Sequence, residues 1–300
     1  MTASSANFAD LINPIFNKIF IDALAFGEKP PIMESVFNVQ NMGKRAYVDD
    51  SYVTGMGLIP EKDKGSAVSY DDIYQGLDKR YTAKTMSMGY RVEKELYEDE
   101  LYGIIQQMPA ALGRSWRATV ETDGANVLNR AETSGYTGSD GKTLLATDHT
   151  LMTGGTQKNR LTTAADLSAT SWEQALIDLK DTTDDRGILL DLKPAALVYP
   201  NELDFTRKKL FGSSLDPDSG NNAINPVSDS KIKFVEWSYL TDPDAWFILC
   251  EGHMVKWYWR IKPEHYQGND FDTDDAKFKV RGRYAYGWTV PWGFFGSMGG

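Results

Sequence analysis

Acidic side chains at alternate positions bring the sequence closest to a metal-binding motif. Asp270, Asp272 and Asp274 have the spacing with which a calcium loop begins. Such a loop requires glycine at its sixth position and a bidentate acidic ligand at its twelfth, where this chain has Asp275 and Arg281. We therefore expect a solvated acidic loop, with a weak cation site as the open alternative.

Two glycine-containing segments imitate phosphate-binding loops. Residues 141–143 read Gly-Lys-Thr, but the motif needs a glycine five residues before them, where the chain has Tyr136. Gly55 and Gly57 begin a dinucleotide fingerprint that Pro60 interrupts, and no helix pattern follows. Neither segment predicts nucleotide binding.

The nucleophilic and metal-ligating residues are few and scattered. His149, His253 and His265 lie far apart, without a nucleophile-elbow glycine pattern. Asp148 precedes His149, which we expect to be a hydrogen-bonded loop histidine. Cys250 is the only cysteine and lies in an apolar run, so no internal disulfide is possible and a buried thiol is expected. The sequence therefore predicts no catalytic residue, no metal and no cofactor, and it does not predict an enzyme.

Length and composition describe an ordinary folded chain with an acidic balance. Its 300 residues allow one large or two modest domains, and 41% hydrophobic with 25% charged residues are usual values. The 32 basic and 42 acidic side chains give a net charge of -10, which disfavours tight sequence-independent binding to nucleic acid. No apolar run approaches the ~20 residues of a membrane helix, so no membrane contact is expected.

One strand pattern near the C-terminus concentrates positive charge. Residues 277–288 alternate between apolar and basic side chains, which is typical of a long strand with one buried face. We expect the basic face to be ion-paired with acidic residues of the chain or of a neighbour, with weak contact to packaged nucleic acid as the alternative. The basic strand face consists of Lys277, Lys279, Arg281 and Arg283.

The central feature is an extended ribbon, residues 46–92, followed almost at once by a helix pattern. β-prone residues run outward to a charged tip, and a strict alternation over 85–92 returns. A ribbon of this length has no core of its own, so we expect it to pack against a neighbouring subunit and its tip to be an inter-subunit contact. The charged residues of the tip are Glu61, Lys62, Asp63 and Lys64.

The elements around the ribbon are predicted from periodicity and capping signals. An amphipathic helix pattern runs from Phe8 to Leu24, with a kink or restart expected at Pro14, and a helix over 93–130 would span ~57 Å. A capping box at Ser171 begins a further helix, and Asn201 caps another after a buried strand at 195–199. The apolar runs 246–250 and 254–259 resemble a hairpin. Helices and strands alternate without a regular βαβ rhythm, which predicts an α+β fold.

Several downstream motifs stand out, in segments 197–203 (LVYPNEL), 221–226 (NNAINP), 239–247 (YLTDPDAWF) and 271–288. Together they resemble the major capsid proteins of tailed phages, the Mu-type head-subunit group above all. The resemblance covers nearly the whole chain. It implies the Hong Kong 97-type capsid fold, with an N-terminal arm, an extended β-ribbon loop, a peripheral domain with a spine helix, and an axial domain.

The resemblance implies a division of the chain into five parts. Residues 1–45 are the expected arm, and 46–92 the expected extended loop. Residues 93–140 form the peripheral domain with its spine helix, 141–255 the axial domain, and 256–300 the strands that return to the peripheral domain.

The implied function is structural. Many copies, as pentamers and hexamers, would form an icosahedral head around double-stranded DNA, assembled in the host cytoplasm and found in the virion. No charged coiled-coil segment precedes the arm, so a separate scaffolding protein is expected, with a portal and decoration proteins as further partners. An encapsulin-like compartment shell is the alternative within the same fold. A hydrolase or carbohydrate-binding protein that uses Asp and Trp residues is the alternative from another class.

Overall fold

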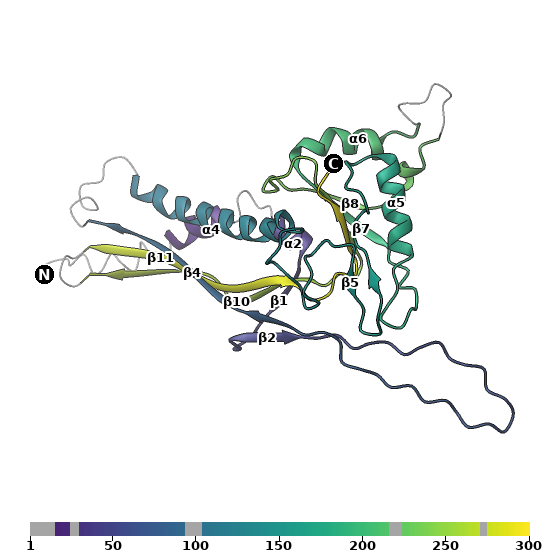
Figure 1. Ribbon diagram of the computed structural model, residues 1–300. Helices are drawn as coiled ribbons and strands as arrows, with labels where there is room; N and C mark the ends of the chain where they lie inside the picture. The colour runs from purple at the N-terminus through teal and green to yellow at the C-terminus, as the bar shows by residue number, and fades with distance from the viewer. Residues whose placement is uncertain (1–15, 25–29, 94–103, 216–223, 271–274) are drawn as a thin grey trace, which may run out of the picture.

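Two four-stranded sheets organise the part of the chain that the computed structural model describes, residues 16–24, 30–93, 104–215, 224–270 and 275–300. The first, the long sheet, has the strand order β1-β10-β11-β4 and lies under a long helix. The second belongs to a lobe at one end of the long sheet, and an extended loop projects away from both (Figure 1).

The long sheet is built on the strand that the basic and apolar alternation predicted. Phe278, Val280 and Tyr284 of β11 are buried, whereas Lys277 and Lys279 are exposed, so the predicted period of two is confirmed. β11 pairs antiparallel with β10 and β4, and β1 pairs parallel with β10. The strands are β1 (Asn38–Asn41), β4 (Lys84–Val92), β10 (Val255–Asn269) and β11 (Ala276–Trp288).

The helix α4 (Ile104–Asn129) covers one face of the long sheet (Figure 1). Its 26 residues correspond to ~39 Å, and Pro109 lies within it. Gly282 of β11 lets the Trp116 ring approach, because a Cβ at Gly282 would lie 2.6 Å from that ring. A long helix in this region was predicted, and its expected start at residue 93 adjoins residues 94–103, which lie outside the described part.

The N-terminal segment packs on its own subunit. Residues 16–24 are helical, and the Phe16 ring lies 5.4 Å from that of Phe278. Phe20 stacks on His265 and belongs to the core under α4. The short helix α2 (Met33–Val36) follows, before β1. The part of the predicted arm before residue 16 lies outside the described residues.

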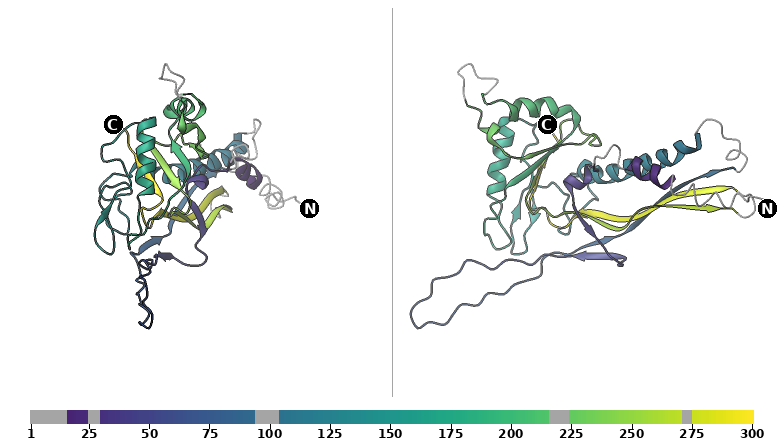
Figure 2. Two further views of the ribbon diagram at one scale, coloured as in Figure 1. Left: turned by 90° about the vertical axis from the view of Figure 1, so that its right-hand side faces the viewer. Right: turned by 180° about the vertical axis from the view of Figure 1, so that it is seen from behind.

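The lobe contains the second sheet, order β12-β9-β7-β8, with two helices packed against it (Figure 2). Trp172 of α5 contacts both Trp246 of β9 and Phe211 of α6, which joins helices and sheet in one apolar core. The strands are β7 (Pro194–Tyr199), β8 (Lys233–Glu236), β9 (Trp246–Cys250) and β12 (Phe294–Ser297), and the helices are α5 (Ala169–Lys180), η1 (Asn201–Leu203), α6 (Asp204–Gly212) and η2 (Pro226–Asp229).

Three local predictions in this region are wrong. β9 and β10 do not form a hairpin, because β9 pairs with β7 and β12 in the lobe while β10 enters the long sheet. The N-cap of α5 is Ser168, whose side chain accepts from the Ser171 amide, so the capping box lies three residues earlier than predicted. Asn201 caps no helix through its side chain, whose amide oxygen instead accepts from Ser238.

Two small two-stranded sheets complete the fold. β2 (Tyr47–Asp50) pairs with β3 (Lys79–Thr82) at the root of the projecting loop, residues 51–78. β5 (His149–Thr150) pairs with β6 (Thr156–Gln157) in the lobe. Within the described residues, none of the helices combines the length and the apolar character that a membrane crossing requires.

Candidate inter-subunit surfaces

The projecting loop is an extended hairpin with little internal support. Near its base, the Thr54 amide donates to the Tyr74 carbonyl at 2.9 Å, and the Gly76 amide donates to the Tyr52 carbonyl at 2.7 Å. From residue 58 to residue 70, all of which are described, the hydrogen bonds lie within the turn at Asp63. The loop therefore has neither a regular ladder nor a core, although the sequence predicted strand at 52–54.

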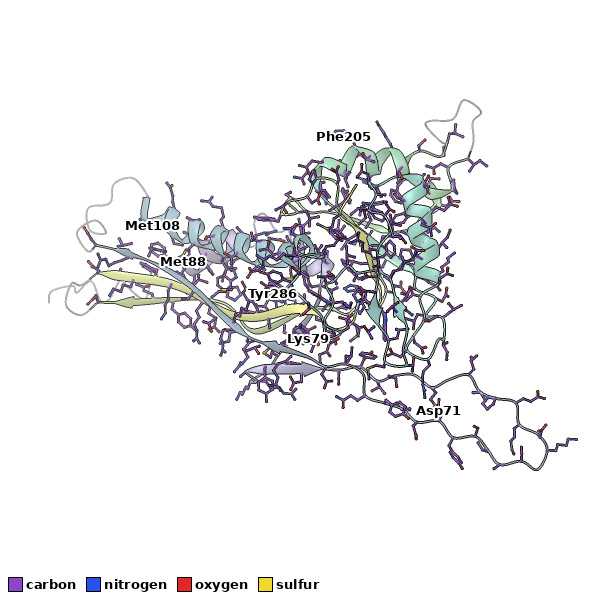
Figure 3. All side chains as sticks on the ribbon, in the orientation of Figure 1. Asp71, Lys79, Met88, Met108, Phe205 and Tyr286 are labelled. Atoms are coloured by element: carbon purple, nitrogen blue, oxygen red, sulfur yellow. The ribbon has the colours of Figure 1, made fainter. Side chains whose placement is uncertain are left out.

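Large apolar side chains of the projecting loop are almost fully exposed in the single subunit. Leu58 is 85% exposed, Ile59 96% and Tyr70 94%. Apolar groups gathered on one exposed segment are typical of a protein-protein contact. Figure 3 shows the side chains standing off the loop on both sides. Further residues of the loop that are more than half exposed are Val53, Met56, Val68, Ile73 and Tyr74.

The charged tip lies where the sequence placed it, at the far end of the projecting loop (Figure 1). Its four charged residues, Glu61 to Lys64, are exposed. Gly65 adopts a φ of 84°, the left-handed conformation that glycine favours, and closes the turn. The sequence prediction named only these charges, whereas exposed apolar side chains also flank them. The adjacent apolar pair Leu58-Ile59, just before Pro60, was the signal that could have indicated this apolar contact.

The basic strand face lies on the side of the long sheet turned away from α4. Lys277 forms an ion pair with Asp270, and the Lys279 ammonium lies 5.7 Å from the centre of the Tyr266 ring. Arg281 and Arg283 are half-buried on the same strand face. The four cations therefore share one surface, and an ion pair within the chain occupies Lys277.

The residues that imitate catalytic motifs make structural contacts. His149 is buried, with Nδ1 2.6 Å from Asp140 and Nε2 3.0 Å from Asn159. Asp148 instead pairs with Lys142, whose Gly-Lys-Thr segment forms a bend after a turn. The candidate calcium loop includes residues 271–274, which lie outside the described part. Among the described residues, no three His, Cys, Asp or Glu side chains converge on a possible metal position.

Burial shifts the pKa of the single cysteine and of two histidines. Burial raises the pKa of the Cys250 thiol to about 12, and the side chain is inaccessible, as predicted. Burial also lowers the pKa of His253 and that of His265. These pKa shifts follow from loss of hydration, and they do not indicate a catalytic pair of an acid and a base.

Comparison with known families decides what these surfaces belong to. Residues 78–296 match the family model described as phage capsid protein. The chain belongs to the phage capsid protein family. The match extends from β3 into β12 and includes α4, the lobe and three of the four strands of the long sheet, β4, β10 and β11. The capsid protein has no match among curated protein sequences.

Solved capsid structures share the fold at low sequence identity. The mature capsid of bacteriophage PhiM1 aligns with a TM-score of 0.59 at 10% identity, covering 86% of this chain and 84% of that one. The capsid of cyanophage P-SCSP1u gives 0.57 at 10% identity, covering 89% and 88%. A virus-like particle from Pyrococcus furiosus gives 0.52 at 9% identity, covering 95% and 98%.

The capsid protein therefore has the predicted α+β fold of the Hong Kong 97 type, and its role as a structural shell protein follows from its family. Membership of the Mu-type group stays a prediction. The projecting loop, apart from its last residue, lies outside the matched residues 78–296.

Proposed function

We propose that this capsid protein is the major head subunit, which assembles as pentamers and hexamers into an icosahedral shell around double-stranded DNA. The single observation that carries the proposal is the projecting loop. Its apolar side chains are exposed and its hydrogen bonds are few, so the loop gains its packing from a neighbouring subunit.

The division into parts inferred from the sequence is retained in this proposal. Residues 1–45 serve as the arm, 46–92 as the extended loop, 93–140 as the peripheral domain, 141–255 as the axial domain and 256–300 as the returning strands. Within these parts, only 51–78 project as a loop, β4 belongs to the long sheet, and β12 joins the sheet of the lobe. The axial domains meet around the five-fold and six-fold centres, and the charged tip, Glu61 to Lys64, contacts the next subunit.

The remaining partners follow from the same assignment. A separate scaffolding protein guides assembly in the host cytoplasm, and a portal and decoration proteins complete the head. The basic strand face contacts packaged DNA weakly at most, because the net charge of the chain is -10 and an acidic side chain pairs with Lys277. The subunit has no catalytic role.

The test substitutes exposed apolar side chains of the loop and leaves the core of the subunit unchanged. Leu58→Ser combined with Ile59→Ser removes two side chains that are 85% and 96% exposed, so the subunit should unfold at an unchanged temperature. Burial of such side chains contributes about 1.5–3 kcal/mol each, which every copy in the shell would lose. Electron microscopy and sedimentation should then detect free subunits or capsomers in place of shells.

A matched control distinguishes the loss of the loop contact from a general effect of making the surface more polar. Leu189→Ser changes a side chain that is 61% exposed on the lobe, and shells should form normally. Normal shells from the Leu58→Ser, Ile59→Ser variant would overturn the role of the loop.

An encapsulin-like shell is the second candidate function, because the Pyrococcus furiosus virus-like particle has the same fold. Nuclease-protected DNA inside particles purified from their natural source supports the phage head, whereas an enclosed protein cargo without DNA supports the compartment.

A further inference from the structure

One arginine of the lobe binds both strands of the projecting loop near its base. The Arg186 guanidinium lies 2.5 Å from the Asp71 carboxylate and donates to the Asp72 carbonyl at 2.9 Å. Its Nε donates to the Gly55 carbonyl, on the opposite strand of the loop, at 3.3 Å. Asp71 in turn accepts from the Gly57 amide at 2.8 Å. We call this set, Arg186 with Gly55, Gly57, Asp71 and Asp72, the Arg186 latch.

The hairpin that presents Arg186 is itself tightly closed. The Asp184 carboxylate accepts from the amides of Arg186 and Ile188, both at 2.8 Å, and the Asp184 amide donates to the Ile188 carbonyl. Gly187 has a φ of 80°, which the turn requires. The adjacent Asp185 is 1% exposed and accepts from the Met152 amide, which anchors the hairpin in the lobe.

The projecting loop also packs closely against the lobe near the Arg186 latch. A Cβ at Gly55 would lie 2.8 Å from the Asp184 carboxylate, so the backbone of the loop passes directly against the hairpin. Tyr52 contacts Trp292 edge-on, with ring centres 4.9 Å apart. Burial, and then the neighbouring Asp185 carboxylate, raise the pKa of the Tyr52 phenol. The base of the projecting loop therefore makes backbone, aromatic and charged contacts where it passes the lobe.

The guanidinium suits this task because its planar fork donates in several directions at once. The Arg186 side chain is 19% exposed and that of its partner Asp71 is 43% exposed, so the guanidinium itself is largely covered while its carboxylate partner lies at the surface. Arg80 and Asp49 at the root of the loop form the contrasting case, with side chains 60% and 48% exposed. That pair joins β2 to β3 and makes no contact with the lobe hairpin, so it does not determine the direction of the loop relative to the lobe.

We propose that Arg186 is a positioning residue that fixes the direction in which the projecting loop leaves its own subunit before any neighbour is present. A free hairpin without a core samples many directions, and each docking event would have to order it. A loop held in one direction loses less conformational entropy on assembly, so shells form faster and at lower subunit concentration. The inference rests on the proposed docking role of the loop.

The experiment measures the direction of the loop in the unassembled full-length subunit. Nitroxide labels at Ser66→Cys on the tip and Glu173→Cys on α5 report the distance between loop and lobe by pulsed electron resonance. Both positions are exposed, and the native Cys250 is buried, so it stays unlabelled. With Arg186 intact, we expect one narrow distance peak.

Three variants make the result decisive. Arg186→Gln should replace the narrow peak by a broad distribution, and Arg186→Lys, which keeps the charge without the fork, should restore it in part. Arg80→Gln should leave the peak unchanged. Thermal unfolding of each variant verifies that the lobe stays folded.

Unchanged distances in Arg186→Gln would overturn the positioning role. Shell yield, measured separately, distinguishes this failure from that of the proposed function. A broadened loop with slower assembly supports both. A broadened loop with normal assembly overturns the role of the Arg186 latch in assembly. It leaves the docking role of the loop standing, because the Leu58→Ser, Ile59→Ser variant tests that role separately.

Discussion

A buried polar chain at the root of the projecting loop offers a stability prediction. Asp50 of β2 accepts from the Lys256 ammonium of β10 at 2.5 Å and from the Thr289 hydroxyl. The Thr289 hydroxyl also bonds the Tyr81 hydroxyl of β3 at 2.8 Å. The side chains of Lys256 and Asp50 are 11% and 16% exposed, so this ion pair fixes β2 and β3 to the long sheet with little solvent around it.

Removal of either partner leaves the other charge in a largely dry place. Breaking a buried pair typically costs 3–5 kcal/mol, and the residual exposure here leads us to expect about 3 kcal/mol for Lys256→Met and slightly less for Asp50→Asn. The double variant leaves no charge unpaired and should cost only about 1–2 kcal/mol. For a chain of this size, 3 kcal/mol corresponds to a fall of about 5 °C in the unfolding temperature.

The assay is denaturant unfolding of the unassembled subunit, followed by tryptophan fluorescence, for the two single variants and the double variant. Arg80→Gln, which breaks the exposed pair with Asp49, is the control and should leave the midpoint unchanged. Additive losses in the double variant would refute the reasoning, because they would show that the two charges do not stabilise one another.

Three further predictions concern single positions. Burial raises the pKa of Glu121, whose carboxylate accepts from the Trp237 indole, so its charged form is penalised in the folded state. In urea unfolding, the free energy of unfolding of the wild type relative to that of Glu121→Gln should therefore increase as the pH falls from 7 towards 5. Gly282→Ala should destabilise by about 1–3 kcal/mol, because its methyl group would meet Trp116, whereas Gly268→Ala, in open space, serves as the control in thermal unfolding. The Cys250 thiol should resist a thiol reagent at pH 8 until denaturant is added, and rapid reaction in native buffer would contradict its burial.

The sequence was informative where one element decides its own burial. The alternation in β11 needed no knowledge of its partners, because the predicted apolar positions Phe278, Val280, Tyr284 and Trp288 are all buried. The stripe along α4 was equally readable. The charged tip was located because Gly65 and its neighbours form a local turn.

Predictions from the sequence failed where contacts with residues far away in the chain determine strand pairing or burial. The apolar runs before and after Gly252 read as one hairpin, yet Phe247 lies opposite Val198 in the lobe, and Trp257 lies opposite Tyr286 in the long sheet. Leu58 and Ile59 have the composition of a core segment, and only the arrangement of the whole subunit shows that nothing in it covers them. The Arg186 latch joins residues more than a hundred positions apart and left no pattern in the sequence.

The pairing of the long sheet also determines when the subunit becomes competent during its synthesis. Asn38 of β1 lies opposite Lys256, and Lys84 of β4 lies opposite Tyr284, so these contacts span about 200 residues, a separation that slows sheet formation. A nascent chain on the ribosome can complete α4 well before β11 exists, and α4 then has no sheet to cover. We therefore expect a chain that ends before β11 to lack a folded surface for its neighbours and to be left out of the growing shell.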